Sequence, residues 1–342
     1  MPRLLEPVAA RLSAVWDNAR LCAVLGAVAI AFSSILVRLS HASPSTAAIF
    51  RCLYALPLLG LLAWWEDRRF GRRMWRDRRV AIAAGVFFAA DLILWHHSIA
   101  DVGAGLATVL ANVQVVLVPL VAWAVLAERP HARVLAALPL ALLGVFLISG
   151  ALEHGAFGRD PARGAVFGLG AGVAYVGFLL LLRRGGVDLR RPAGPLFDAT
   201  ATAAAFCVVA GLLIGDADLI PVWPGAGWLI TLALTSQVLG WLLITTSLPR
   251  LPAALTSVLL TIQPVGSVIL AALIFSEAPT GLQLTGVVLI IGALLVATRT
   301  GRGRVTAPVT ATAPVTATRP ELAPDLQQLA RVGTGSMGDS ST

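Results

Sequence analysis

Lysine is absent from this chain, and charged residues of either sign are scarce. All 26 basic side chains are arginine, and charged residues occupy only 13% of the 342 positions. Hydrophobic residues occupy 57%, and the mean hydropathy is +0.83. So few charges cannot cover the water-facing surface of a globular protein. The composition therefore excludes a soluble domain and predicts an integral membrane protein.

Cysteine is also rare, and the common enzyme motifs are missing. Cys22, Cys52 and Cys207 lie inside apolar runs without the spacing of metal ligands, which argues against a disulfide framework and a zinc site. The sequence has no P-loop, GxSxG, HExxH or CxxC motif. We therefore expect no catalytic residues, no metal and no cofactor. A membrane-embedded transferase stays as an alternative, although the carboxylates and histidines inside apolar runs are few.

The apolar residues gather in runs that are long enough to cross a bilayer. A spanning helix needs about 20 residues to cross roughly 30 Å of hydrocarbon. Ten segments approach that length, which predicts an all-α integral membrane fold with ten transmembrane helices. The segments are 21–39, 45–65, 80–99, 104–127, 132–150, 164–182, 197–215, 226–248, 252–276 and 280–298.

The arginines indicate how the chain crosses the membrane. Short cytoplasmic loops carry an excess of basic residues. With a cytoplasmic N-terminus, only Arg38, Arg159 and Arg163 fall outside. We therefore expect a plasma-membrane protein with both termini cytoplasmic, whose arginine clusters contact anionic lipids rather than nucleic acid. Seven arginines lie between the second and third predicted spans: Arg68, Arg69, Arg72, Arg73, Arg76, Arg78 and Arg79.

The chain contains an internal repeat. A shift of 149 residues places the segment that starts at Ser98 on the segment that starts at Ser247, with ten of 33 positions identical. Composition alone explains matches between apolar residues better than matches between polar and turn residues. The polar and turn matches are Ser98/Ser247, Gln114/Gln263, Glu128/Glu277 and Pro130/Pro279.

The repeat sets the predicted domain organisation. We predict two homologous five-span halves, 21–150 and 164–298, with 1–20 as a cytoplasmic N-terminal segment. The Pro/Thr/Ala-rich region 301–342 is predicted to be a disordered cytoplasmic tail. Because five is an odd number, the second half enters the bilayer from the opposite side. Inverted-topology repeats recur in secondary transporters, which hold the substrate near the midplane between the repeats.

The repeat, its Glu-x-Pro junctions and Arg51 in FRCLYALPLLGLL resemble the EamA-type ten-span members of the drug/metabolite transporter superfamily. The resemblance covers residues 21–298, and its most specific part is the pattern Q-x(13)-E-x-P in both halves. It implies a basket of helices around a central cavity, with the fifth and tenth spans at the periphery. It also implies export or exchange of amino acids, other metabolites or toxic compounds.

Two charged residues lie well inside predicted spans. A charge at the bilayer centre costs about 2.5–3.5 kcal/mol on insertion scales, so such a residue is expected to face protein or water. Arg51 and Asp91 both lie about 12 Å from the outer ends of their spans, at 1.5 Å per residue. The matching depth predicts an intramembrane ion pair. Its role stays open between a structural clamp and substrate or proton coupling. His96 and His97 are adjacent and point about 100° apart, which argues against a metal site.

Other polar and aromatic side chains fall on shared helix faces and are candidate cavity residues. Gln114 and Gln263 are expected to point elsewhere, whereas Trp95 and Trp241 are both expected to face the central cavity. Interhelical hydrogen bonding, typically worth about 0.6 kcal/mol each, is the alternative for every one of them. The candidate substrate-binding residues are Asp91, Trp95, Ser98, Thr108, Asn112, Tyr175, Gln237, Trp241, Thr245 and Thr261.

These features predict a secondary transporter that moves a small metabolite by alternating access. The mixture of aromatic, amide and hydroxyl groups suits an amino acid-like or other amphiphilic solute, and we expect export. The alternatives are a multidrug or cationic toxin exporter, a channel, and the transferase named above. The sequence indicates neither a coupling ion nor an oligomeric state.

Overall fold

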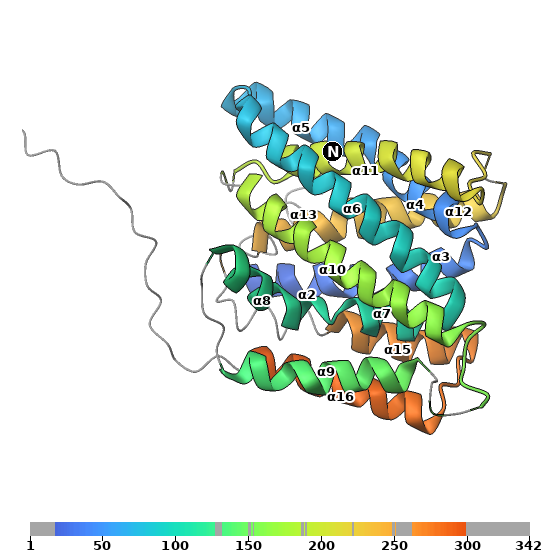
Figure 1. Ribbon diagram of the computed structural model, residues 1–342. Coiled ribbons are helices and arrows are strands. Elements are labelled where there is room, and N and C mark those ends of the chain that lie inside the picture. Colours follow the sequence, from blue (N-terminus) through green and yellow to red (C-terminus); the bar gives the residue numbers. More distant parts are fainter. Residues whose placement is uncertain are drawn as a thin grey trace, which may run out of the picture. The chain divides into compact units, whose positions relative to one another are not determined.

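The computed structural model describes residues 18–126, 132–149, 152, 154–185, 188, 190–220, 222–247, 250 and 262–298. Every regular element in these ranges is a helix (Figure 1). The chain divides into two units, Met1–Gly301 and Arg302–Thr342, and all described residues belong to the first. The predicted disordered tail and most of the predicted N-terminal segment lie outside the described residues.

The helices follow the order of the predicted spans, and several spans consist of two or three consecutive helices. The bounds are α2 Ala19–Ala31, α3 Ser33–Leu39, α4 Pro44–Leu53, α5 Leu56–Phe70, α6 Trp75–Val102, α7 Ala104–Ala111, α8 Gln114–Leu126, α9 Ala132–Ile148, α10 Pro161–Gly185, α11 Ala193–Ile214, α12 Gly225–Leu232, η2 Ala233–Gly240, α13 Trp241–Ser247, α15 Ile262–Phe275 and α16 Gly281–Thr298.

Six helical stretches in the described ranges are long and apolar enough to cross a membrane. They are Ala19–Leu39, Pro44–Phe70, Trp75–Val102, Pro161–Leu182, Ala193–Ile214 and Gly225–Ser247. Three shorter apolar helices lie within the fifth, ninth and tenth predicted spans: Leu135–Ile148, Ile262–Phe275 and Gly281–Val296. The predicted number of ten spans is therefore not confirmed, although every predicted span contains a helix.

The predicted span 104–127 is interrupted at its middle. The side-chain amide of Asn112 donates to the Thr108 carbonyl at 2.8 Å, and its backbone N–H reaches the same carbonyl at 3.2 Å. An asparagine side chain that competes for a helix carbonyl weakens the regular pattern of backbone bonds. The chain makes a tight turn at Asn112 and Val113, and α8 starts at Gln114.

The packing of the helices repeats between the two halves, as expected for inverted repeats. The long helices α6 and α10 run side by side, and the related pair is α2 with η2 and α13. Helices α9 and α16 pack mainly on each other, at the lower edge in Figure 1. These two helices correspond to the fifth and tenth predicted spans, which therefore lie at the periphery as the family resemblance implied.

Carboxylates at the ends of α5 and α11 also repeat between the halves. Glu66 accepts hydrogen bonds from the backbone N–H groups of Ala193 and Gly194, at 2.9 and 2.8 Å. Asp216 accepts one from the N–H of Ser45 at 3.2 Å. Ser45 and Gly194 are separated by the same 149 residues as the sequence repeat. Each half thus caps the first turn of a helix in the other half, where backbone N–H groups lack helical partners.

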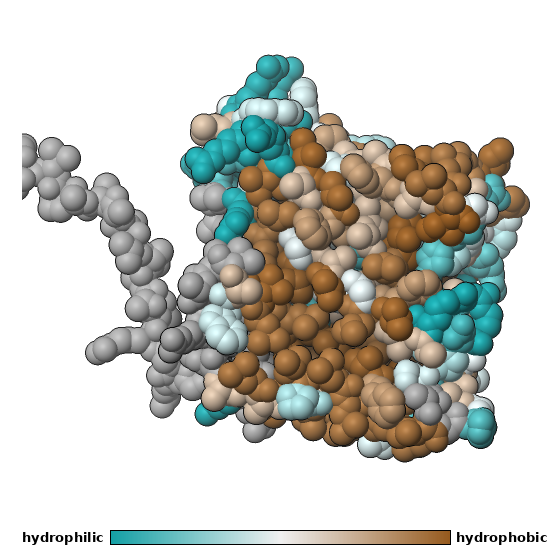
Figure 2. Space-filling view, in the orientation of Figure 1, coloured by the Kyte–Doolittle hydropathy of each residue, from teal (hydrophilic) through white to brown (hydrophobic). Residues whose placement is uncertain are grey.

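The outer surface is apolar over a broad area. Figure 2 shows hydrophobic side chains covering most of one face, with hydrophilic residues gathered toward its edges. Leu213, Leu273 and Val288 expose 83%, 76% and 67% of their surface. Water does not favour such an extended apolar surface, whereas lipid does. The chain is a multi-pass membrane protein.

Close helix packing depends on glycine at several crossings. One such crossing is the glycine ridge of α10, where a Cβ atom on Gly164, Gly168 or Gly172 would collide with α6, α7 or both. In the peripheral pair, a Cβ on Gly144 would lie 2.7 Å from the Gly286 carbonyl oxygen, and one on Gly286 would lie 2.6 Å from the Gly144 carbonyl oxygen.

We expect Gly286→Leu to separate α9 from α16 and to lower the melting temperature and the yield of monodisperse protein in detergent. Overpacking of this kind costs about 1–3 kcal/mol or more. Gly292→Leu is the matched control, because it lies on the same helix and a Cβ there meets no atom within 4 Å. Equal melting temperatures for the two variants would contradict the close crossing.

Candidate functional site

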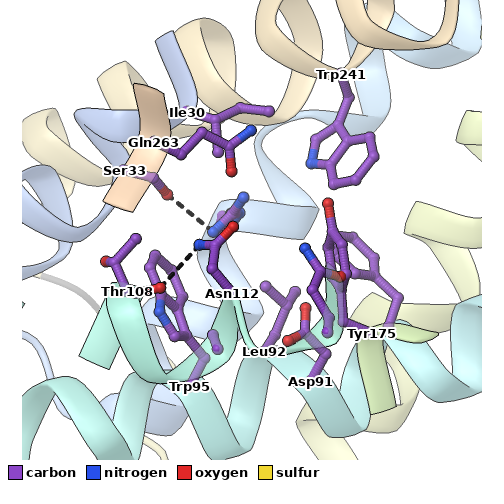
Figure 3. A pocket seen from close by; sticks show the side chains of 14 residues that line it. Ile30, Ser33, Asp91, Leu92, Trp95, Thr108, Asn112, Tyr175, Trp241 and Gln263 are labelled. Atoms are coloured by element: carbon purple, nitrogen blue, oxygen red, sulfur yellow. Dashed lines mark hydrogen bonds between the residues drawn. The ribbon is translucent and has the colours of Figure 1, made fainter. Parts of the chain in front are cut away.

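A cavity lies between the helices of the two halves. Its volume is about 60 Å³, which is room for a few water molecules. Residues from α2, α3, α4, α6, α7, α8, α10, α13 and α15 line it, so both repeats contribute (Figure 3). The lining residues are Ile30, Ser33, Arg51, Phe88, Asp91, Leu92, Trp95, Thr108, Ala111, Asn112, Gln114, Tyr175, Trp241 and Gln263.

The Arg51 side chain is buried in this cavity and is held by neutral groups. Its Nε–H donates to the side-chain oxygen of Gln237, and one Nη–H donates to the Ser33 hydroxyl, each at 3.0 Å. Gln237 in turn donates to the Thr200 hydroxyl at 3.1 Å. The guanidinium carbon lies 5.7 Å from the ring centre of Trp95, within the range of a cation–π interaction.

Asp91 lines the same cavity from α6, but the predicted direct ion pair with Arg51 is not present. The ion pairs between described residues include none that joins these two side chains. Both side chains are buried and line the cavity. Depth does not fix the direction of a side chain, however, and the hydroxyl and amide partners of Arg51 come from other helices.

Four aromatic rings pack together on one side of the cavity. Phe88 and Phe178 stack with their centroids 4.3 Å apart, and Trp241 meets Phe178 edge-on at 5.1 Å. Tyr175 lies 5.8 Å from Trp241. Trp95 lines the cavity apart from this cluster. Both tryptophans that were expected to face the cavity do line it.

Two polar atoms of the cavity wall are buried without a partner. The indole N–H of Trp241 and the side-chain oxygen of Gln114 make no hydrogen bond in the described part of the chain. Buried polar groups are nearly always satisfied, so each of these atoms is available to a water molecule or a bound solute. Gln114 and Gln263 were expected to point elsewhere, and that prediction was wrong, because both line the cavity. The break between α7 and α8 changes the direction that regular helical spacing gives to Gln114.

The comparison with protein families now identifies the chain. A model of the EamA-like transporter family matches residues 18–150 and again residues 162–299. The chain belongs to the EamA-like transporter family. A solved crystal structure, whose title names no activity, is similar to this chain with a TM-score of 0.56 and 18% identity, and the match covers 82% of this chain and 97% of that chain. At that identity the likeness shows the fold alone. No curated protein matches the chain.

The remaining candidate residues of this EamA-like chain lie at the edge of the cavity or away from it. Thr108 and Asn112 line the cavity while bonding to their own helix, and Gln237 acts behind Arg51 rather than at the cavity wall. Ser98 donates to the Gly164 carbonyl at 2.8 Å, which joins α6 to α10. Thr245 donates to the Trp241 carbonyl at 2.8 Å. The alternative of interhelical hydrogen bonding therefore fits Ser98, whereas Thr245 bonds within its own helix. Thr261 lies outside the described residues.

Sequence reasoning missed Ser33 and Ile30, which line the cavity of this EamA-like fold from α2 and α3. The hydroxyl pair Ser33–Ser34 inside the first apolar run was the available signal, because both side chains are polar and completely buried. The unusual π-helical winding of η2, which includes Gln237, had no sequence signal of comparable strength. Such segments often occur at functional sites.

The two histidines have separate environments, as their adjacent positions predicted. His96 is buried, and its Nδ1 lies 3.2 Å from the Pro44 carbonyl oxygen. His97 lies 3.4 Å from the Asp216 carboxylate. Within the ranges that the structure describes, no group of three or more histidine, cysteine or acidic residues could hold a metal ion.

Ion pairs join elements of this EamA-like fold at both ends of the helix bundle. Asp198 is buried between Arg73 and Arg78, at 2.7 and 3.2 Å. These two arginines were assigned to lipid contact from sequence. At the opposite end Asp101 pairs with Arg159 and Arg163, at 2.8 and 2.7 Å. The ion pairs tie together elements that are distant in the sequence.

Proposed function

We propose that the chain is a secondary transporter that exports a small amphiphilic metabolite, such as an amino acid-like solute, across the plasma membrane by alternating access. The observation that carries this proposal is the cavity between the repeats, to which both repeats contribute a charged or aromatic residue. Arg51 and Asp91 come from the first half, and Tyr175 and Trp241 come from the second. A site between inverted repeats becomes accessible from either face when one repeat moves against the other.

The other candidate functions fit this cavity less well. A cationic toxin would meet Asp91 and the aromatic rings, but it would also lie near the buried guanidinium of Arg51, which repels cations. A channel requires a continuous path, whereas packed rings of Phe88 and Phe178 close one side of this small cavity. A transferase would need several carboxylates or histidines together, and such a group is missing from the described residues.

We also propose that the end of the bundle that carries Arg68 to Arg79 faces the cytoplasm. Reporter fusions at Arg72 and after Asp188 should then report a cytoplasmic location, and a fusion at Asp218 should report the opposite side. The measurement is the ratio of alkaline phosphatase to green fluorescent protein activity at each site. The reverse ratios would overturn the orientation and with it the proposed cytoplasmic termini.

Counterflow in proteoliposomes tests the transporter proposal directly. Vesicles are preloaded with one unlabelled solute, and uptake of the same labelled solute is followed for amino acids, nucleosides and a cationic dye. A transporter gives saturable uptake that is stimulated by the internal solute, because reorientation with bound solute exchanges one molecule for another. Flux that rises linearly with concentration and shows no stimulation would indicate a channel instead.

A further inference from the structure

The geometry points to a cavity that selects zwitterions: the solute's carboxylate binds the guanidinium of Arg51, and its ammonium group binds the carboxylate of Asp91. This inference rests on the proposed transport function and assigns the two recognition residues. Its basis is that the cavity is lined by a buried basic side chain and a buried acidic side chain, with no hydrogen bond or ion pair between them in the described structure.

Arg51 has donors to spare on a fixed side chain. Its contacts with Ser33 and Gln237 use one Nε–H and one Nη–H, and a guanidinium carries five N–H donors. The remaining donors have no partner among the described residues. Two neutral groups hold the guanidinium in place, and no carboxylate of a described residue forms an ion pair with it. A planar fork with free donors suits a carboxylate, which can accept two parallel hydrogen bonds.

Asp91 supplies the opposite charge at a separate place on the wall. It exposes only 6% of its surface and accepts no hydrogen bond from any residue that the structure describes. An ionised carboxylate offers acceptor sites on both oxygens. An ammonium group has three donors and no acceptor, so it complements such a carboxylate.

The two orphan atoms of the wall extend the same pattern. The Trp241 indole is a donor, like Arg51, and the Gln114 oxygen is an acceptor, like Asp91. A zwitterion carries acceptors at one end and donors at the other. Figure 3 shows Trp241 and Asp91 on opposite sides of the cavity, both directed toward the space between them. Ile30, Leu92 and Trp95 supply apolar contacts for the rest of the solute.

Selectivity follows from the charges that would be left over. A bound zwitterion is neutral overall, and it gives each buried protein charge a partner. A solute with only an ammonium group leaves Arg51 without an anion, and a solute with only a carboxylate leaves Asp91 without a cation. A buried unpaired charge is far more costly than a buried pair. Unpaired charges of this kind are how a site rejects the wrong ligand.

The test uses the full-length protein in proteoliposomes and matched solutes. For leucine, threonine and phenylalanine, each labelled amino acid competes in counterflow with its unlabelled self, its amide and its N-acetyl derivative. The amide keeps the ammonium and loses the carboxylate, and the N-acetyl derivative does the reverse. We expect both derivatives of the transported amino acid to compete roughly 10- to 100-fold more weakly, because each loses a charged hydrogen bond.

Two variants give the inference a crossed signature. In Asp91→Asn the N-acetyl derivative should compete more strongly relative to the amino acid than it does in the wild type. In Arg51→Gln the amide should show the same relative gain in competition. A variant that only destabilised the protein would weaken competition by all three solutes equally. Asp188→Asn makes the same chemical change on an exposed carboxylate bound to Arg190, and it should leave the selectivity unchanged. If Arg51→Gln does not fold, Arg51→Lys keeps the charge but removes the parallel N–H donors of the guanidinium. This variant should weaken competition by the amino acid more than competition by the amide.

The outcomes separate this inference from the transport proposal. Saturable exchange of the cationic dye, with no exchange or competition by any amino acid, would overturn zwitterion selection and leave transport standing. Selectivity that is unchanged in Asp91→Asn would also overturn it, and a simultaneous loss of pH-driven uptake would assign Asp91 to proton coupling. Absence of saturable exchange for every solute would defeat the transport proposal itself.

Discussion

Replacing Glu277 with alanine should leave little folded protein. In the described structure Glu277 makes no hydrogen bond to a residue of the cavity wall, so the effect comes from its other contacts. The Glu277 carboxylate accepts from the backbone N–H groups of Ala104 and Gly105, at 2.9 and 3.2 Å, and pairs with Arg38. Gly103 leaves the space for it, because a Cβ there would lie 2.8 Å from the carboxylate.

The expected size of the effect follows from what alanine would expose. Ala104 is completely buried and Gly105 is buried, so without the carboxylate their N–H groups would lose their acceptor inside the protein. Each orphaned buried N–H costs about 1–3 kcal/mol. Arg38 is 37% exposed, so the loss of its ion pair adds less. A protein that is stable by about 5–15 kcal/mol is strongly affected by such a loss.

Fluorescence size-exclusion chromatography during heating measures this effect. Glu277→Gln should have an intermediate melting temperature, because its amide oxygen still accepts one of the two N–H groups. Asp188→Ala removes an exposed carboxylate and serves as the control. If Glu277→Ala had the same melting temperature as the wild type, the cap at the start of α7 would contribute nothing to stability.

Trp241→Phe should fold normally and transport poorly. Trp241→Ala should fail to fold normally and should not transport. The indole is buried against Phe88, Tyr175 and Phe178, so truncation removes packing worth about 3–5 kcal/mol. Phenylalanine retains most of that packing but lacks the buried N–H that has no partner in the described part of the protein. We expect about tenfold lower exchange, because that donor is available to the solute.

Trp228→Phe is the matched control for this prediction. Trp228 lies on α12 in the same half and exposes 38% of its surface, so the change removes an indole N–H far from the aromatic cluster. Melting temperature and the Michaelis constant for exchange are measured together. A normal Michaelis constant and normal rate for Trp241→Phe would show that the solute does not use the indole.

The fold was more predictable from the sequence than the site, for a physical reason. Apolar runs, arginine loops and the repeat between Gln114 and Gln263 reflect constraints that the bilayer imposes on every residue of a span. The direction of one side chain inside a span depends on local breaks in the helix. Asn112 ends α7 early and turns Gln114 into the cavity, and regular 3.6-residue spacing cannot anticipate that.

Partners of charged residues were the least predictable part. Arg51 and Asp91 do line one cavity, but Gln237 reaches Arg51 from a π-helical segment of the other half. Asp198, at the start of the seventh predicted span, pairs with Arg73, which lies between α5 and α6. Such pairings are long-range, and only the packing of the helices decides them.

The small volume of the cavity has a consequence for measured affinities. Ligand sites usually enclose about 300–1,000 Å³, so a space of about 60 Å³ must enlarge before it holds a metabolite. The apparent dissociation constant then equals the intrinsic one divided by the population of the enlarged conformation. A population of one in ten weakens binding about tenfold without any change in a contact. Substitutions that loosen the packing around Phe88 and Phe178 can therefore tighten binding while they lower stability.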